Sequence, residues 1–288
     1  MNKLVRYFKL YILLLAGLCV VGCQTSSPLP PAETVIESPA SQITITQPPV
    51  LSEQLLSKYQ AVIPQQWGEQ VSGVAYRLDT QERVLALTLD ACGGSDLANG
   101  FDVDLIDYLR KMQIPATLFV SGQWIDANQS EFLDLANRQN FVIGNHGLKH
   151  LPCSVSGKSA YHIKGTGSAA EVIQEVSANG VKIAGLTGRK PLYYRSGTDY
   201  YDEVGVAVAR DLGYVTIGYS MAGDAGATFN REQVKKTLLE ARAGSIILLH
   251  FNHPEGQTAE GLLEAIPILQ QQGFKFVQLS DYPLVTYP

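Results

Sequence analysis

Residues 84–94 read VLALTLDACGG, a short apolar run that ends at the carboxylate of Asp90 and is followed by glycine. A run of this length, bounded by polar residues and glycine, is typical of a strand that is buried on both faces. In residues 102–111, which come next, apolar side chains recur near helical spacing. A buried strand followed by an amphipathic helix predicts the repeating unit of a parallel α/β sheet.

The same alternation continues to the end of the chain. The expected strands are Val84–Leu89, Ala116–Val120, Phe141–Gly144, Leu192–Tyr194, Tyr214–Tyr219, Ser245–Leu249 and Phe274–Leu279. The expected helices are Asp102–Lys111, Glu131–Arg138, Ala169–Ala178, Glu203–Leu212, Arg231–Ala243 and Ala259–Gln272. About seven parallel strands predict an α/β fold, a distorted (β/α) barrel that is one unit short. The long polar stretch at 151–167 interrupts the repeat, and we expect it to form a loop on the functional face.

Polar side chains follow the ends of these strands. The residues are Asp90, Asn145, His146, Arg195, Asp224 and His250. Because the C-terminal ends of parallel strands lie on one face, we expect these side chains to converge. Taken singly, each has a structural explanation, such as a buried Asp paired with an Arg. Taken together, several charged groups on one rim favour an active site.

Two histidines of this set suggest a metal site. His146 and His150 are separated by Gly147-Leu148-Lys149. If those three residues form one helical turn, both imidazoles lie on one side and can bind one ion. Imidazole and carboxylate ligands favour zinc, with cobalt, nickel, manganese and iron as alternatives.

The beginning of the chain carries a targeting pattern. Lys3, Arg6 and Lys9 precede an apolar run over 10–22, which is shorter than the ~20 residues that a membrane-spanning helix needs. The run ends at Gly22-Cys23 and resembles a bacterial lipoprotein signal, in which the cysteine takes a lipid. The alternative is an ordinary signal peptide that is cut nearby.

We therefore expect a lipoprotein signal peptide at 1–22, a flexible lipid-anchored linker at 23–52 and a folded domain at 53–288. The protein would be exported and held in the cell envelope through the lipid on Cys23. Gln24 suggests, by the same resemblance, the outer membrane facing the periplasm if the cell is Gram-negative. The formal net charge of −5 argues against nucleic-acid binding, because phosphate contacts need a basic surface.

Five motifs together resemble the polysaccharide deacetylase family, the NodB homology domains of carbohydrate esterase family 4, over residues 84–282. The resemblance implies a distorted (β/α) barrel, in agreement with the strand–helix pattern. Residues 87–94, LTLDACGG, are similar to the T-F-D-D-G motif. Asp90 then stands at the general base, and Ala91 replaces an Asp that binds the metal.

The remaining motifs are NHGLKH at 145–150, YRSG at 194–197, the surroundings of Asp224 and LLH at 248–250. They imply that His146 and His150 bind a divalent metal, most simply Zn²⁺, and that His250 is the general acid. Arg195 would hold Asp90, and Asp224 would pair with His250 and keep it protonated. The implied reaction removes N-acetyl groups from a glycan that contains N-acetylglucosamine, such as peptidoglycan, a chitin oligomer or an exported polysaccharide. The metal would make water easier to deprotonate.

Ala91 leaves the expected metal site one carboxylate short. Three arrangements are compatible with the sequence: Asp90 itself binds the metal; Cys92, Asp96 or His253 takes the vacant place; or the site is metal-poor and inactive. We favour Asp90 as a ligand. The alternative function is a catalytically weak or inactive carbohydrate-binding envelope lipoprotein of the same fold. Hydrolysis of a non-sugar amide is a third interpretation.

Two expectations concern the surroundings of the site. Cys92 and Cys153 each follow an expected site residue closely along the chain. If those site residues converge, the cysteines are neighbours and form a disulfide in an oxidising compartment, with two free thiols as the alternative. Tyr194 and Tyr200 flank Arg195, and they are candidates for the aromatic lining of a sugar groove.

Overall fold

The computed structural model describes residues 49–288. The predicted signal peptide at 1–22, Cys23 with its lipid and nearly all of the linker at 23–52 lie outside the described residues. The first element, helix α1 (Pro49–Tyr59), begins within the last residues of that linker. Within residues 49–288, no helix combines the length and the apolar character that a membrane crossing requires.

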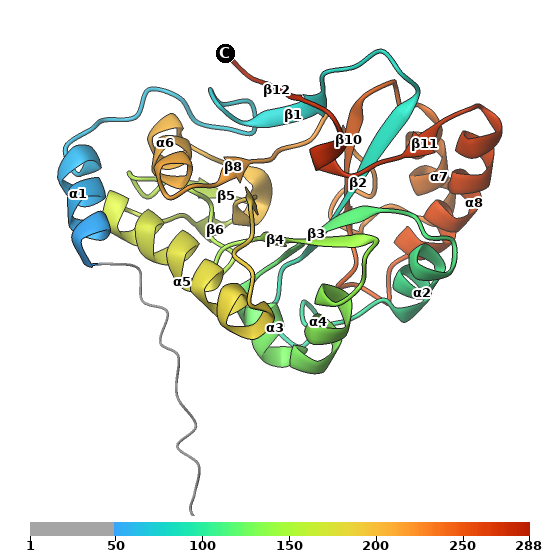
Figure 1. The fold of residues 1–288 in the computed structure, drawn as a ribbon, viewed down its shortest axis with the longest axis horizontal. Helices are drawn as coiled ribbons and strands as arrows, with labels where there is room; N and C mark the ends of the chain where they lie inside the picture. The colour runs from blue at the N-terminus through green and yellow to red at the C-terminus, as the bar shows by residue number, and fades with distance from the viewer. Residues whose placement is uncertain (1–48) are drawn as a thin grey trace, which may run out of the picture. The chain divides into compact units, whose positions relative to one another are not determined.

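The fold is a distorted (β/α) barrel, as the strand–helix alternation predicts (Figure 1). Parallel strands follow the spatial order β10, β2, β3, β4, β7 and β8, and β11 pairs with the start of β2. The strands are β2 (Val84–Ala91), β3 (Ala116–Val120), β4 (Phe141–Asn145), β7 (Tyr193–Tyr194), β8 (Val215–Thr216), β10 (Ser245–His250) and β11 (Lys275–Phe276). Each of them lies within or beside a predicted strand.

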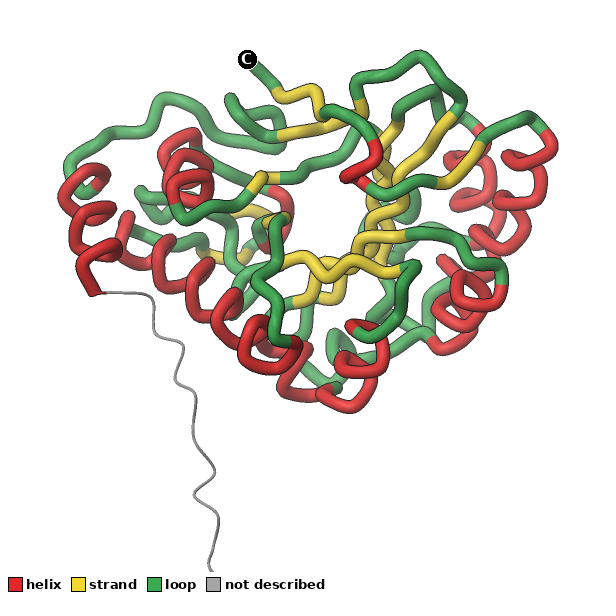
Figure 2. Tube along the Cα trace, in the orientation of Figure 1, coloured by secondary structure: helices red, strands yellow, loops and turns green. Residues whose placement is uncertain are grey.

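Short strands that the sequence pattern did not indicate complete the barrel. β1 (Ala75–Leu78) pairs antiparallel with β10 on one side and with β12 (Leu284–Thr286) on the other. Ala75 also bridges to Ile217, just beyond β8, so the start of β1 joins the two ends of the sheet. β9 (Met221–Ala222) adds to β10. The strands therefore surround a common axis, and the helices lie outside them (Figure 2).

Helices cover the outer side of the strands. They are α2 (Val103–Lys111), α3 (Gly122–Ala127), α4 (Gln129–Ala136), α5 (Ala169–Thr187), α6 (Glu203–Asp211), α7 (Arg231–Leu239) and α8 (Thr258–Gln271). The side chain of Asp102 caps α2 by accepting a hydrogen bond from the backbone N–H of Leu105. α5 runs well past its predicted end and stops at Gly188, whose φ of 72° suits glycine. The sequence pattern did not indicate α1 or α3.

Alternate residues of β2 face two different cores, and this determines where its polar side chains lie. Those on the helix side are Leu85, Leu87, Leu89 and Ala91. Val84 and Ala86 pack inside the barrel with Phe119. Because side chains alternate along a strand, Thr88 and Asp90 continue the inward row toward the C-terminal mouth of the barrel. β2 therefore presents the carboxylate of Asp90 at the position where a barrel carries its active site.

The long polar stretch at 151–167 lies on the functional face, as predicted. It contains the two-stranded hairpin of β5 (Ser159–Ala160) and β6 (Ile163–Lys164). Tyr161 and Ile163, at the tip and on the return strand, line the cavity described next.

Candidate active site

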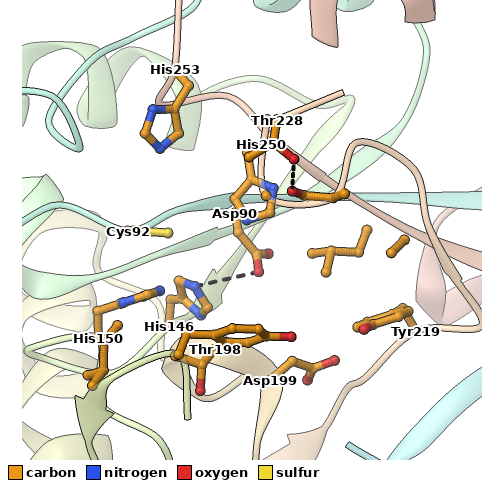
Figure 3. A pocket seen from close by; sticks show the side chains of 16 residues that line it. Asp90, Cys92, His146, His150, Thr198, Asp199, Tyr219, Thr228, His250 and His253 are labelled. Atoms are coloured by element: carbon orange, nitrogen blue, oxygen red, sulfur yellow. Dashed lines mark hydrogen bonds and ion pairs between the residues drawn. The ribbon is translucent and has the colours of Figure 1, made fainter. Parts of the chain in front are cut away.

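A cavity of about 550 Å³ opens at the C-terminal ends of the parallel strands (Figure 3). Asp90 near the end of β2, His146 just after β4 and His250 at the end of β10 all line it. β2 and β10 are neighbours, and their register places His250 beside Asp90. The structure thus brings into one cavity three residues that are far apart in the sequence.

Arg195 is fully buried and holds the carboxylate of Asp90 in place. Its guanidinium has no exposed surface and donates to Asp90 Oδ1 at 2.8 Å. The same group donates to the backbone carbonyls of Ile217 and Gly218 at 3.1 and 2.8 Å, and it lies 4.4 Å from the ring centre of Phe119. A buried guanidinium with this set of partners has a single orientation, so the carboxylate of Asp90 is fixed as well.

The rings of His146 and His150 lie close together, although the residues between them do not form the helical turn that we expected. Gly147 and His150 have φ values of 76° and 59°, and the ring centres of His146 and His150 are 4.8 Å apart. Buried Glu175 on α5 braces the loop, because its Oε1 accepts hydrogen bonds from the backbone N–H groups of Lys149 and Leu151. A Cβ at position 147 would lie 2.5 Å from that oxygen, which explains the glycine.

His146 is oriented for metal binding. Its Nδ1 lies 3.0 Å from the backbone carbonyl of Arg195, which leaves Nε2 facing the cavity, 3.5 Å from Asp90 Oδ2. Burial lowers the pKa of His146, so the ring is held in its neutral form. A neutral imidazole whose second nitrogen bonds a carbonyl is the usual arrangement of a metal-binding histidine.

Cys92, and not Asp90, completes the group of ligand atoms with the two histidines. In the described part of the chain, the ligand atoms of Cys92, His146 and His150 all lie within 4.8 Å of one another. Our preferred interpretation, with Asp90 as the third ligand, stays a prediction: Arg195 binds Asp90 Oδ1, and Asp90 Oδ2 lies 3.5 Å from His146 Nε2. Asp96 and His253 do not belong to the group either.

The position of Cys92 results from a sharp turn after β2. Gly93, with a φ of 74°, lets the chain pass close to α3, where a Cβ would lie 2.4 Å from the backbone nitrogen of Trp124. Half-buried Cys92 therefore returns to the cavity, whereas Ala91 packs among the helices. Burial raises the pKa of the Cys92 thiol, but His150 and His250 outweigh it and lower the pKa to about 6.

His250 and Asp224 form the second ionic pair of the cavity. His250 Nδ1 lies 3.0 Å from Asp224 Oδ1, and the His250 backbone N–H donates to Oδ2 at 2.7 Å. The hydroxyl of Thr258 donates to the same Oδ2 at 3.1 Å. Burial lowers the pKa of His250, yet the charge of Asp224 outweighs this effect and raises that pKa well above its usual value. Burial raises the pKa of Asp224, and His250 outweighs it, so that this pKa lies below the usual value.

Two expectations about the surroundings are wrong. Cys92 and Cys153 are both free thiols, because Cys153 is buried against α6, where a Cβ on Gly205 would lie 2.6 Å from its Sγ. Tyr194 does not line a groove, since its side chain is fully buried in the core between α5 and α6. Tyr200 packs against the rings of Trp67 and Tyr161, so it supports the cavity wall from behind Tyr161.

Some lining residues were not identified from the sequence. They include Tyr161, Thr198, Asp199 and Tyr219. The polar loop at 151–167 indicated the approximate place of Tyr161, but no local pattern distinguished it from other exposed tyrosines. Asp199 lies four residues after Arg195 in an irregular turn, and its inward direction follows only from the three-dimensional path of that turn.

Known proteins resemble this chain in sequence and in fold. The family model for polysaccharide deacetylases matches residues 77–217, from β1 to just beyond β8. The peptidoglycan-N-acetylmuramic acid deacetylase PdaA of Bacillus subtilis is 26% identical over 230 residues, which cover 76% of this chain and 80% of that protein. The peptidoglycan-N-acetylglucosamine deacetylase of Bacillus cereus is 26% identical over 212 residues, covering 72% and 92% of the two chains.

Among solved structures, a CE4 family pseudoenzyme from Bacillus anthracis superimposes with a TM-score of 0.60 at 20% identity, over 72% of this chain and 67% of that chain. At this identity the likeness concerns the fold. The matched family segment contains Asp90, His146, His150 and Arg195, and it ends before Asp224 and His250. Residues 77–217 of this chain are therefore similar in sequence to the polysaccharide deacetylase family.

Proposed function

We propose that this chain is a metal-dependent hydrolase that removes N-acetyl groups from a glycan containing N-acetylglucosamine. One observation carries the proposal: three side chains that could hold a metal ion line the same cavity as Asp90 and His250, which are paired with buried Arg195 and Asp224. An amide hydrolase needs a group that accepts a proton from water and another that donates one to the leaving nitrogen. The two pairs are suited to these two tasks.

The donor set fits a catalytic zinc site. A thiolate and two imidazoles are ligands that favour zinc over magnesium or calcium, and three protein ligands leave a position open. Cys92, His146 and His150 would hold the ion, and their ligand atoms lie within 4.8 Å of one another. When bound, such an ion makes water easier to deprotonate and polarises a carbonyl oxygen.

The residues of the chain perform the proton transfers. Asp90, held by Arg195, accepts the proton of the water that attacks the acetyl carbon. His250, kept protonated by Asp224, donates a proton to the sugar nitrogen as the carbon–nitrogen bond breaks. The neutral amide and one water give acetate and a protonated amine on the sugar, and the proton that Asp90 takes from the water restores His250, so that atoms and charges balance. Because Arg195 and Asp224 are almost fully buried, both proton carriers keep their orientation through the reaction.

The test is the release of acetate from N-acetylated chitin oligomers and from peptidoglycan fragments, with metal analysis of the same protein. We expect acetate release by the zinc-loaded protein, none by the chelated protein, and recovery when zinc is returned. His146→Ala should lose both metal and activity. Tight glycan binding without acetate release would instead favour the alternative function, a carbohydrate-binding envelope protein. Turnover of amides without acetate release would favour a non-sugar substrate.

Replacing Asp224 with asparagine is expected to shift the alkaline limb of the pH–activity profile to lower pH. Burial lowers the pKa of His250 and the Asp224 charge raises it, so removal of that charge lets the pKa fall. A general acid works only when protonated, and His250 would therefore lose its proton at a lower pH. We expect a loss of about tenfold or more at alkaline pH and a smaller loss at acidic pH.

Thr258→Val is the matched control for this variant. It removes a hydrogen bond to Asp224 but leaves the carboxylate and its charge in place. The profile of Thr258→Val should keep its alkaline limb. A uniform fall of activity at every pH in Asp224→Asn would contradict the assigned role of the pair.

We also propose that the enzyme works outside the cytoplasm, anchored in the cell envelope by a lipid on Cys23. The support is the sequence of the first 23 residues, a basic start followed by an apolar run that ends in Gly22-Cys23. A tether at 23–52 would let the domain reach a polymeric glycan while it remains attached to a membrane.

A further inference from the structure

The turn after β7 places a second carboxyl group, that of Asp199, beside Asp90 among the residues that line the cavity. Thr198 and Asp199 have φ values of 73° and 55°, in the left-handed region that non-glycine residues rarely adopt. A β-branched residue such as Thr198 is especially disfavoured there, and such backbone strain concentrates at functional sites. Figure 3 shows Asp199 beside Thr198 and below Asp90, among the residues that line the cavity.

One oxygen of Asp199 has no partner. Oδ1 accepts a hydrogen bond from the hydroxyl of Tyr201 at 2.5 Å. Within residues 49–288, Oδ2 has no hydrogen-bond partner, although the side chain is only 4% exposed. Arg195 does not satisfy it, since the hydrogen bonds of its guanidinium are to Asp90, Ile217 and Gly218 and none is to Asp199. A buried polar oxygen without a partner lowers stability, unless a ligand supplies the missing hydrogen bond.

The surrounding wall has the chemistry of a sugar subsite. Tyr161 and Tyr219 line the same cavity, and both hydroxyls donate to Glu69, at 3.4 and 2.8 Å. Aromatic rings beside carboxyl oxygens provide a flat face for a sugar ring and acceptors for its hydroxyls. Among the described residues that line the cavity, none is lysine or arginine.

We propose that Asp199 is a substrate-binding residue whose free carboxyl oxygen forms a hydrogen bond with a hydroxyl of the sugar that carries the acetyl group. This inference rests on the proposed function, in which the acetyl group lies at Cys92, His146 and His150, because Asp199 lines the same cavity as those three residues. A sugar hydroxyl can donate to a carboxylate and accept from a carboxylic acid, so the pairing is available in either protonation state.

The same wall defines a substrate class. It suits an N-acetylhexosamine with free hydroxyls and no carboxylate. An N-acetylmuramic acid residue carries a lactyl ether in place of one hydroxyl, and its carboxylate would face a wall without lysine or arginine. We therefore expect the enzyme to act at least about tenfold better on N-acetylglucosamine residues than on N-acetylmuramic acid residues.

The experiment measures the coupling between the side chain and one hydroxyl. Wild type, Asp199→Ala and Asp199→Asn are assayed on chitin trimers and on analogues that each lack one ring hydroxyl of the reacting sugar. We expect Asp199→Ala to raise KM by about 10- to 100-fold with a smaller effect on kcat, and asparagine to recover part of the loss. For wild type, one deoxy analogue should be a poorer substrate than the parent trimer. For Asp199→Ala, the same analogue should be as good a substrate as the parent trimer.

Tyr201→Phe separates substrate binding from a purely structural role. It removes the hydrogen bond to the other oxygen of Asp199 and leaves Oδ2 unchanged. We expect Tyr201→Phe to prefer the parent trimer over the deoxy analogue, as the wild type does. If Asp199→Ala shows the same losses on every analogue, or if Tyr201→Phe behaves like it, the inference is wrong while the proposed function stands.

A failure of the proposed function gives a different result. If wild type releases no acetate from the parent trimer, the same coupling is measured by calorimetric titration of the zinc-loaded protein with the same trimers. If that titration shows no coupling between Asp199 and any ring hydroxyl, the role of Asp199 is wrong. If it shows coupling, the result supports a sugar-binding subsite without catalysis.

Discussion

Replacing Cys92 with alanine is expected to remove the metal from the purified protein and, with it, the release of acetate. Cys92 supplies one of three ligand atoms that lie within 4.8 Å of one another, and two histidines alone bind zinc weakly. Loss of a group that only hydrogen-bonds to a metal ligand already lowers metal affinity by about 10- to 100-fold, so the loss of a direct ligand should lower it at least as much. Metal analysis after dialysis against a weak chelator, with acetate release on the same sample, measures both effects.

Cobalt substitution provides a readout that does not depend on activity. A thiolate bound to Co²⁺ gives a charge-transfer band in the near ultraviolet, and imidazole or carboxylate ligands do not. We expect this band in the wild type and its loss in Cys92→Ala. Cys92→Asp should recover metal binding without the band, because a carboxylate is also a zinc ligand.

Cys153→Ala is the matched control for Cys92. It replaces the other free thiol of the described residues, which is buried against α6 and does not line the cavity. We expect Cys153→Ala to keep the metal and the cobalt band, with some loss of stability from the cavity it leaves. If Cys92→Ala retained one zinc per chain and an unchanged cobalt spectrum, Cys92 would not be a ligand.

Replacing Asp90 with asparagine is expected to lower kcat by about 10²- to 10⁴-fold while the protein keeps its metal. Asparagine preserves the shape of the side chain and an oxygen that can accept from Arg195, which donates to Asp90 at 2.8 Å. It cannot accept the proton of the attacking water at neutral pH. Steady-state kinetics and zinc content of the same preparation measure the two quantities.

The metal content of this variant decides between two roles for Asp90. A general base held by Arg195 can be replaced without loss of zinc, whereas a ligand cannot. Loss of zinc from Asp90→Asn would restore our interpretation from the sequence, in which Asp90 binds the ion. Asp126→Asn, an exposed aspartate on α3 paired with Lys182, is the control and should change neither quantity.

The barrel and the position of most of its strands follow from local patterns. The sequence shows apolar runs of strand length that alternate with amphipathic segments. This pattern can be recognised because each strand of a parallel barrel is buried on both faces. The same logic located Asp90, His146 and His250, since every parallel strand ends on the same face. β1 and β12 were not predicted, because strands of four and three residues depend on pairing between distant segments and carry little pattern of their own.

The tertiary structure shows which side chain lies beside the two histidines of the candidate metal site. The sequence showed Ala91 at the place of a carboxylate and left several replacements open. Alternation along β2 points Ala91 into the helix-side core and Asp90 into the barrel, and the turn at Gly93 then brings Cys92 back to the histidines. Buried Arg195 binds Oδ1 of Asp90, and Oδ2 lies 3.5 Å from His146 Nε2, so the role of Asp90 as a ligand stays a prediction.

The sequence by itself determined the fold class and the polar rim, because strand alternation and the common direction of parallel strands are local rules. The tertiary structure alone decided which side chains touch. Cys153 is buried against α6 and does not line the cavity with Cys92, Tyr194 lies in the core, and Asp199 lines the cavity from the strained turn at Thr198. These outcomes depend on the path of short irregular segments between regular elements, where backbone direction is set by packing against distant parts of the chain and not by periodicity.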